Sequence, residues 1–201
     1  IYSQDGELKL TASRLDNAKG KVQGKTGLEL DITENIDNQG GKLIAQNGDL
    51  AIKAANLDNR GGELGSLKQA LNARVVGVLR NGVAGIIQGQ RLNLIAGSID
   101  NVGGKISAQV GDALVTTDAF DNRDGNLYVK RLLTITGYAF DNSGETGGRV
   151  AAEHVSLDLS DALNNHKGLI ESTGTLSVSA ASVDNRTGQL RTLGTSGDTL
   201  F

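Results

Sequence analysis

The chain has 201 residues and a formal charge of −3, and its positive and negative residues are well mixed. It therefore lacks the basic patch typical of nucleic-acid-binding proteins and the polybasic segment typical of proteins that bind a membrane surface. It contains 28 glycines but no proline and no cysteine, which excludes a disulfide framework, thiolate metal sites and a cysteine nucleophile. Glycine without proline indicates tight turns between strands that all use their backbone N–H groups. No apolar stretch is long enough to span a bilayer, and no signal peptide is visible.

A triplet of an apolar residue, Asp and Asn recurs along the chain. The first copy is Leu15-Asp16-Asn17, and complete copies follow at 36–38, 57–59, 99–101, 120–122, 140–142 and 183–185. Two degenerate copies, at 79–81 and 163–165, fill the gaps and carry Arg80 and Asn164 in place of Asp. Successive copies are 20 to 23 residues apart, about 21 on average, so we interpret them as structural repeats. The chain begins and ends inside repeat-like sequence, and we expect it to be a segment of something longer.

Each repeat has further fixed positions around the triplet. Alternating apolar residues precede it, and this period of two predicts half-buried strands near 8–12, 28–32, 50–54, 92–96, 133–135 and 176–180. Three residues after the Asn a glycine usually follows, at 20, 41, 62, 104, 125, 168 and 188. Five residues after the Asn an apolar residue follows: Val22, Leu43, Leu64, Ile86, Ile106, Leu127, Ile170 and Leu190. After Asn142 a three-residue insertion moves this apolar position to Val150.

A single strand-turn unit of this length buries little, so the repeats must bury their apolar residues against one another. No unit shows the period of 3.6 residues expected of a helix, which argues against a leucine-rich repeat. We therefore predict an all-β fold, a right-handed parallel β-helix of about nine rungs of about 21 residues, formed by residues 1–201 as one segment. The apolar residues before the Asp become a column inside it: Leu15, Ile36, Leu57, Leu79, Ile99, Phe120, Phe140, Leu163 and Val183.

The Asn residues form the strictest column of the repeat. Asn tolerates positive φ, bonds nearby backbone and stacks amide to amide, so it suits a corner between two faces. The expected corner ladder consists of Asn17, Asn38, Asn59, Asn81, Asn101, Asn122, Asn142, Asn165 and Asn185. The neighbouring Asp residues would repel one another if stacked and buried, so we expect them to point outward or to accept backbone N–H bonds. Lys21, Lys42 and Lys105 are placed to offset their charge.

Two chemical functions compete with this structural interpretation. A calcium site would use the Asp column, but one carboxylate per rung offers too few oxygen ligands. A polysaccharide-degrading β-helix enzyme would need clustered carboxylates in a cleft, and the chain departs from regularity only at 143–149 and around 161–167. His154 and His166 have no recognisable triad or metal spacing, although Asp158 and Asp161 lie near His154 in sequence. We expect no catalytic residue, no metal and no cofactor.

The aromatic residues leave a binding function open. Tyr128 and Tyr138 are candidates for exposed side chains that stack on sugar rings, and this would make the segment a carbohydrate-binding module. Each could equally be a ladder residue beside Phe120 and Phe140, and we favour that interpretation.

The units "NLDNRGGELGSLKQALNA" and "NIDNQGGKLIAQNGDLAIKAANLDNRGG" resemble the haemagglutinin repeats of large Gram-negative exoproteins. These include filamentous haemagglutinin adhesins and the toxin-delivery proteins of contact-dependent growth inhibition. The resemblance covers essentially the whole chain. It implies a right-handed β-helix filament that is exported by a two-partner outer-membrane transporter, is displayed at the cell surface of a Gram-negative bacterium, and meets a receptor or glycan on a host or neighbouring cell.

Overall fold

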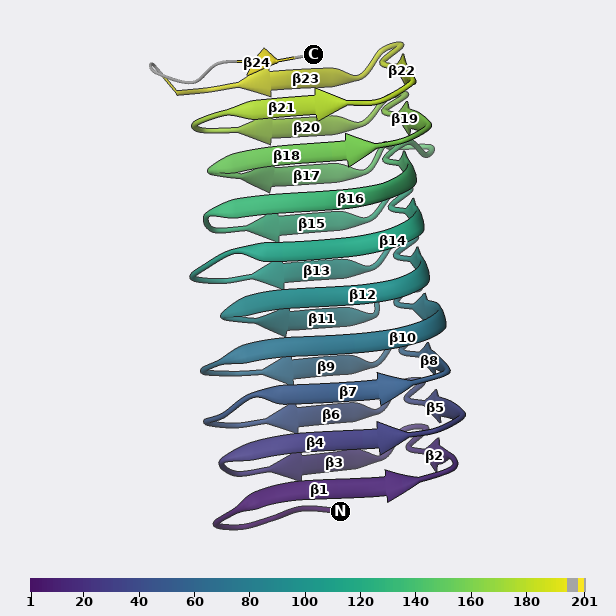
Figure 1. Cartoon of the computed structure of the whole chain (residues 1–201), viewed down its shortest axis with the longest axis vertical. Coiled ribbons are helices and arrows are strands. Elements are labelled where there is room, and N and C mark those ends of the chain that lie inside the picture. The colour runs from purple at the N-terminus through teal and green to yellow at the C-terminus, as the bar shows by residue number, and fades with distance from the viewer. Residues whose placement is uncertain (195–198, 201) are drawn as a thin grey trace.

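The computed structural model describes residues 1–194 and 199–200 and contains no helix in that part of the chain. All its paired strands are parallel, and each rung pairs with the rungs before and after it, so the chain forms a β-solenoid of about nine turns (Figure 1). As the chain rises from β1 to β23, the strands in front run left to right and those behind run right to left, which makes the coil right-handed (Figure 1). The predicted fold class is therefore confirmed.

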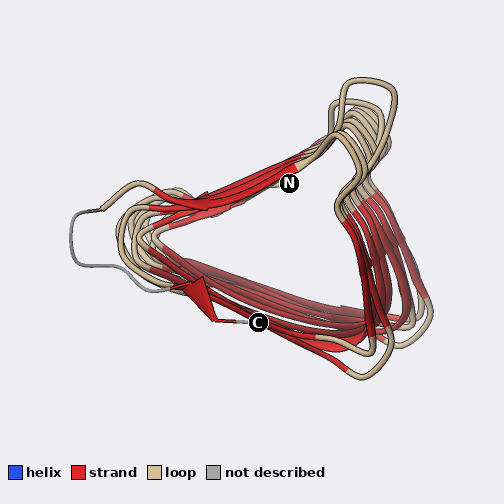
Figure 2. Cartoon of the chain, turned by 90° about the horizontal axis from the view of Figure 1, so that it is seen from above, coloured by secondary structure: helices blue, strands red, loops and turns tan. Residues whose placement is uncertain are grey.

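Seen along its axis, the coil has a triangular outline with three faces (Figure 2). We call the face toward the viewer in Figure 1 the front face. Its strands are β1 (Glu7–Ala12), β4 (Gly27–Ile32), β7 (Leu50–Ala54), β10 (Ala70–Arg80), β12 (Arg91–Asp100), β14 (Ala113–Asp121), β16 (Leu132–Asp141), β18 (His154–Leu159), β21 (Leu176–Ser179) and β24 (Thr199–Leu200).

The other two faces carry shorter strands. The side face contains β2 (Leu15–Asp16), β5 (Asn35–Asp37), β8 (Asn56–Asp58), β19 (Ala162–Asn164) and β22 (Ser182–Asp184), together with the ends of β10, β12, β14 and β16, which continue around the corner. The back face contains β3 (Lys21–Gly24), β6 (Lys42–Ala45), β9 (Glu63–Ser66), β11 (Ile86–Gly89), β13 (Lys105–Ala108), β15 (Asn126–Val129), β17 (Arg149–Ala152), β20 (Leu169–Ser172) and β23 (Gln189–Thr192).

The core fills the triangle with stacked apolar columns from all three faces. In the side-face column, Ile36 stacks on Leu57 of the next rung, and Phe120 stacks on Phe140. The ring centroids of the two phenylalanines are 5.0 Å apart. Seven members of this column, from Ile36 to Leu163, are buried. Burial of each such side chain contributes roughly 1.5–3 kcal/mol, which offsets the entropy lost on ordering the strands.

Four predicted core positions differ in the structure. Val183 is 45% exposed, and Leu15 and Leu190 are only partly buried, because their strands β22, β2 and β23 lie at the ends of the stack and pair with a neighbour on one side only. On the back face, Ile87 rather than Ile86 is buried and aligned with Leu64 and Ile106. The turn after Asn81 has one extra residue, which shifts the inward position by one.

Candidate functional site

The corner between the side and back faces holds the Asn column, and we call it the asparagine corner. The Nδ2 of each Asn donates to the Oδ1 of the Asn on the next rung at 2.7 or 2.8 Å, from Asn17 through to Asn185. Seven of the nine side chains, Asn38 to Asn165 in the column, have no exposed surface; Asn17 is 7% exposed, and Asn185 is exposed at the last rung. The eight bonds form one continuous amide ladder inside the corner.

A glycine closes the turn on every rung, because its backbone N–H donates to a carbonyl earlier in the turn. On most rungs that carbonyl belongs to the Asn itself, as for Gly41 and Asn38 at 3.0 Å. A Cβ at Gly41 would lie 2.1 Å from the backbone oxygen of Asn17 on the rung below, so no side chain fits there. The residue just before this glycine holds the positive φ, and several types occupy it, including Lys19 and Thr187. The second glycine of "RGG" is therefore required by close stacking rather than by the bend.

The Asp column lies just outside this ladder. On eight rungs, an Oδ1 at the Asp position accepts the backbone N–H two residues later at 2.9–3.1 Å, and Asn164 does the same as the carboxylates. Arg80 is the exception, since it offers no acceptor. These bonds fix the chain at the start of the turn, as Asx turns do.

Arginines rather than lysines offset the Asp charge. Arg60, Arg123 and Arg186 each form a two-point ion pair with the Asp two residues earlier, with shortest N–O distances of 2.6–2.7 Å. Hydrogen bonds from Arg186 hold the pKa of Asp184 at about 2. The expected role of Lys42 was wrong, because its Nζ pairs with Glu63 of the next rung at 2.7 Å; Lys21 and Lys105 form no ion pair within the described residues. The "DNR" triplets at 58–60, 121–123 and 184–186 were the signal for these pairs.

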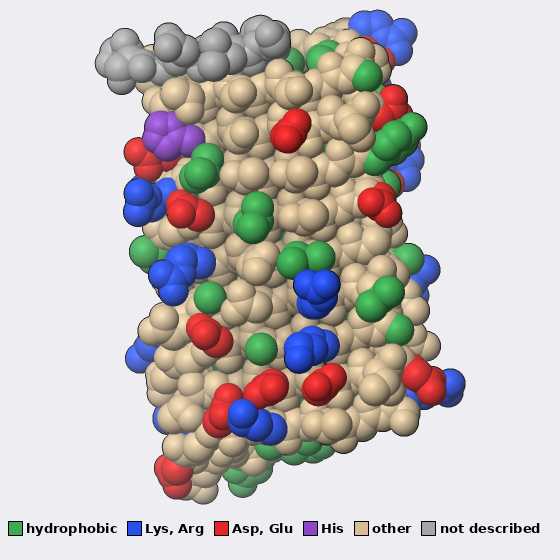
Figure 3. Space-filling model, in the orientation of Figure 1, with side chains coloured by type: hydrophobic (Ala, Val, Ile, Leu, Met, Phe, Trp, Pro, Cys, Tyr) green, Lys and Arg blue, Asp and Glu red, His purple; other side chains and the backbone are tan. Residues whose placement is uncertain are grey.

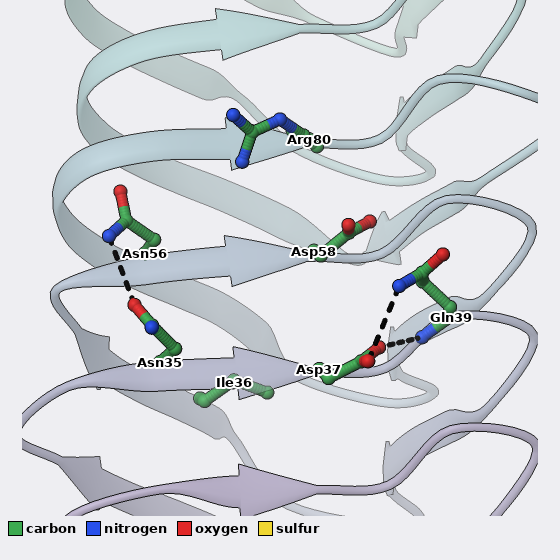
Figure 4. Close-up of a pocket in the computed structure, with 7 residues that line it drawn as sticks. All are labelled: Asn35, Ile36, Asp37, Gln39, Asn56, Asp58 and Arg80. Carbon is green, nitrogen blue, oxygen red and sulfur yellow. Dashed lines mark hydrogen bonds between the residues drawn. The ribbon is translucent and has the colours of Figure 1, made fainter.

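An open depression lies on the side face where Arg80 interrupts the Asp column (Figure 4). Asn56 donates to Asn35 at 3.0 Å across it, and Arg80 lies one rung above Asp58. In Figure 4 the Arg80 guanidinium points along its strand and away from Asp58. Partial burial opposes ionisation of Asp58, but hydrogen bonds and charge from Arg60, with a smaller contribution from Arg80, bring its pKa below the usual range. These groups keep the carboxylate of Asp58 ionised.

The inserted turn after Asn142 folds back onto the rung below. The Oδ1 of Asp124 accepts hydrogen bonds from the backbone N–H groups of Thr146 and Gly147 and from the Thr146 hydroxyl, at 2.8–3.1 Å. The Oδ2 of Asp124 accepts one from the backbone N–H of Glu145 at 3.2 Å. The bond from the Thr146 backbone is the main reason that the pKa of Asp124 is lowered. The insertion, which Figure 2 shows reaching beyond the other turns, is thus an anchored loop.

The two tyrosines lie on different parts of the surface. Tyr128 on β15 is 48% exposed on the back face, and Tyr138 on β16 is 57% exposed near the corner between the front and side faces. The favoured expectation that they are core ladder residues was wrong, because Tyr128 alternates outward after the buried Leu127. A shallow depression beside Tyr128 is lined by Asn126, Tyr128, Arg149, Ala151, Leu169 and Glu171.

The two histidines lie apart, with His154 at the start of β18 and His166 in a turn of the asparagine corner. His154 Nδ1 accepts the backbone N–H of Thr175 at 3.2 Å and contacts its hydroxyl at 2.9 Å. Asp158 lies four residues further along the same strand, about 13 Å away. Across residues 1–194 and 199–200, no three His, Cys, Asp or Glu side chains are grouped so that they could hold a metal ion. In the same residues, no helix has the length and apolar character needed to cross a membrane.

Comparison with known proteins gives one family. The model of the haemagglutinin repeat matches five overlapping segments, residues 3–40, 28–76, 68–124, 108–153 and 148–200, which together cover nearly the whole chain. No curated protein and no solved structure matches it.

Proposed function

Since the chain belongs to the haemagglutinin repeat family, we propose that it is a rod segment of a longer, secreted filamentous exoprotein displayed at the surface of a Gram-negative cell. The observation that carries the proposal is the amide ladder, which links all nine rungs by side-chain hydrogen bonds in addition to the sheets. Buried polar ladders of this kind fix the register of stacked rungs and make the stack stiff. A stiff spacer suits a filament that holds a functional end away from the cell, in adhesion or in contact-dependent toxin delivery.

The proposed export route uses an outer-membrane transporter of the two-partner type. The chain has no cysteine and no proline, so an unfolded chain passing through a pore would form no disulfides and undergo no slow prolyl isomerisation. The rungs can then form one after another outside the cell, because each needs only its neighbour.

Labelling of the producing bacterium tests surface display. An antibody raised against the purified chain is expected to label intact cells, and the label should be lost when the transporter gene is deleted. Labelling only after permeabilisation would overturn the proposal. Incubation of the chain with polysaccharides, followed by product analysis, is expected to give no turnover.

A second candidate function is glycan binding at the back face, and the depression beside Tyr128 favours it. The exposed ring can stack on a sugar, while Arg149 and Asn126 offer planar hydrogen-bond donors next to it. A glycan array should then give binding that Tyr128→Ala abolishes. Tyr138→Ala is the matched control, because Tyr138 is as exposed but lies away from this depression. Equal losses in both variants, or no binding by the parent chain, would exclude the site.

A further inference from the structure

The corner between the back and front faces differs from the asparagine corner, and we call it the variable corner. Its connections contain one to four residues: 25–26, 46–49, 67–69, 90, 109–112, 130–131, 153 and 173–175. In Figure 2 it lies at the left, across the back face from the asparagine corner. Within residues 1–194 it has no side-chain ladder like that of the asparagine corner, and most of its side chains face solvent.

Four cations gather at the middle of this corner. Lys68, Arg91, Lys130 and Arg131 are exposed, and none of them forms an ion pair within residues 1–194. In Figure 3, blue side chains lie along the left edge of the front view, which is this corner, with red side chains between them. A chain with a net charge of −3 therefore carries a local excess of positive charge along one edge.

Exposed apolar side chains alternate with these cations. Leu67 is 44% exposed, Val110 60% and Leu132 39%. A groove at the same place is lined by Lys68, Gln69, Gln90, Arg91, Val110, Gly111, Asp112 and Arg131. The aliphatic stem of Arg91 lies against Gly111 of the next rung, where a Cβ would come within 2.7 Å of its Cγ. The guanidinium is thus held at the edge while its stem covers the backbone.

Three carboxylates lie near this edge, and their charges reduce but do not cancel those of the four cations. Asp112 Oδ1 accepts the backbone N–H of Leu132 at 3.2 Å, and Asp49 Oδ1 accepts that of Ala70 at 2.9 Å. Glu153 lies one rung beyond Arg131, beside His154 at 3.7 Å. The Asp column lies across a back face of four-residue strands, about 13 Å long, which exceeds the screening length of about 8 Å at physiological salt.

From this arrangement we propose that the variable corner at 67–68, 90–91, 110 and 130–132 is a contact edge for an anionic lipid surface. The cations face lipid phosphates, and the apolar side chains enter the boundary between headgroups and acyl chains. The edge is convex and spans three rung spacings, about 14 Å, so several rungs meet a flat surface along one line. It has no aromatic ring for stacking on a sugar, and its apolar residues have no role in binding a soluble polyanion.

Vesicle flotation with the full chain tests the proposal. The chain should float with vesicles of phosphatidylcholine containing about one-third phosphatidylglycerol and should not float with phosphatidylcholine alone. The triple variant K68Q/R91Q/R131Q should bind about 100-fold more weakly at physiological salt. The matched control K53Q/R74Q/K105Q removes three unpaired cations from the front and back faces and should bind within about twofold of the parent. Melting curves of all variants establish that they are folded.

The apolar contribution is tested separately, because it distinguishes a lipid surface from other anions. Leu67→Ser with Val110→Ser keeps every charge and should weaken flotation about tenfold. The proposal is overturned if the control variant loses as much binding as the corner variant, or if the parent does not float. It is also overturned if the serine variant floats as well as the parent, since the edge would then bind the vesicles through charge alone. Surface labelling of cells does not depend on this result, so the two proposals fail separately.

Discussion

The asparagine corner and the variable corner turn the same chain by opposite means. Seven of the nine turns at the asparagine corner contain four residues, and a buried amide ladder runs through them. The turns of the variable corner contain one to four residues and share no side-chain contact of this kind. A corner whose side chains bond to the next rung must repeat its sequence, whereas a corner whose side chains face outward can change it. The comparison separates positions that build the rod from positions available to a partner.

The largest expected effect comes from breaking the amide ladder in its middle. Asn101→Leu leaves the Oδ1 of Asn122 without a donor in a buried corner. It also removes one acceptor of the Asn81 Nδ2, which keeps the carbonyls of Gly85 and Lys105. We expect a loss of about 2–5 kcal/mol of unfolding free energy, since each unsatisfied buried polar group costs about 1–3 kcal/mol. The control Asp100→Asn keeps an acceptor for the Val102 N–H, as Asn164 does on its rung, and should cost less than about 0.5 kcal/mol. Equal shifts in denaturant midpoints would show that the Asn column is not the structural requirement.

The paired glycines of the same turn, Gly103 and Gly104, should respond unequally. A Cβ at Gly104 would lie 2.1 Å from the backbone oxygen of Asn81, so Gly104→Ala forces neighbouring rungs apart and should cost about 3 kcal/mol. Gly103 has a φ of +64° but no atom within 4 Å of a Cβ, so Gly103→Ala should cost only about 1 kcal/mol of backbone strain. Calorimetry of the two variants measures this difference, and a reversed order would refute the stacking explanation.

Insertions should sharpen the contrast between the corners. Two glycines added after Gln90 lengthen a one-residue connection to three, which lies within the range of the variable corner, and should cost about 1 kcal/mol. The same insertion after Val102 displaces Gly104 from its turn and should cost more. The natural insertion after Asn142 is anchored by Asp124, whereas the rung below Val102 has Ala84 at the corresponding position. Similar melting temperatures for the two insertion variants would show that the two corners tolerate extra residues equally well.

The smallest expected effect is a local pH dependence at the anchored loop. The folded pKa of Asp124 is lowered, so its bonds to the loop are fully present above the ordinary pKa of about 3.9 and are lost as the pH falls through the lower folded value. NMR signals of the Thr146 and Gly147 amides should therefore shift below about pH 4. Asp124→Asn should remove this shift, whereas Asp158→Asn, at an exposed position on β18, should leave it unchanged.

The repeat made much of this fold predictable. A period of 21 residues with fixed apolar positions defines one rung, and stacking then gives parallel strands and continuous columns. Val183 and Tyr128 could not be placed this way. A repeat assigns the same environment to every rung, although Val183 lies on a strand paired on one side only, and the face of Tyr128 depends on the alternation within β15.

The sequence by itself determined the repeat, the parallel coil and the identity of the Asn column, because each of these depends on contacts that every rung makes in the same way. Only the tertiary structure decided which glycine is sterically required and that the side chains of Lys68, Arg91 and Arg131 share one edge. These three cations lie 23 and 40 residues apart, about one and two rungs, but no residue type recurs at their positions as Asn does in its column. The shared edge is recognised only when the rungs are stacked, because the connections at this corner differ from rung to rung in length and in residue type.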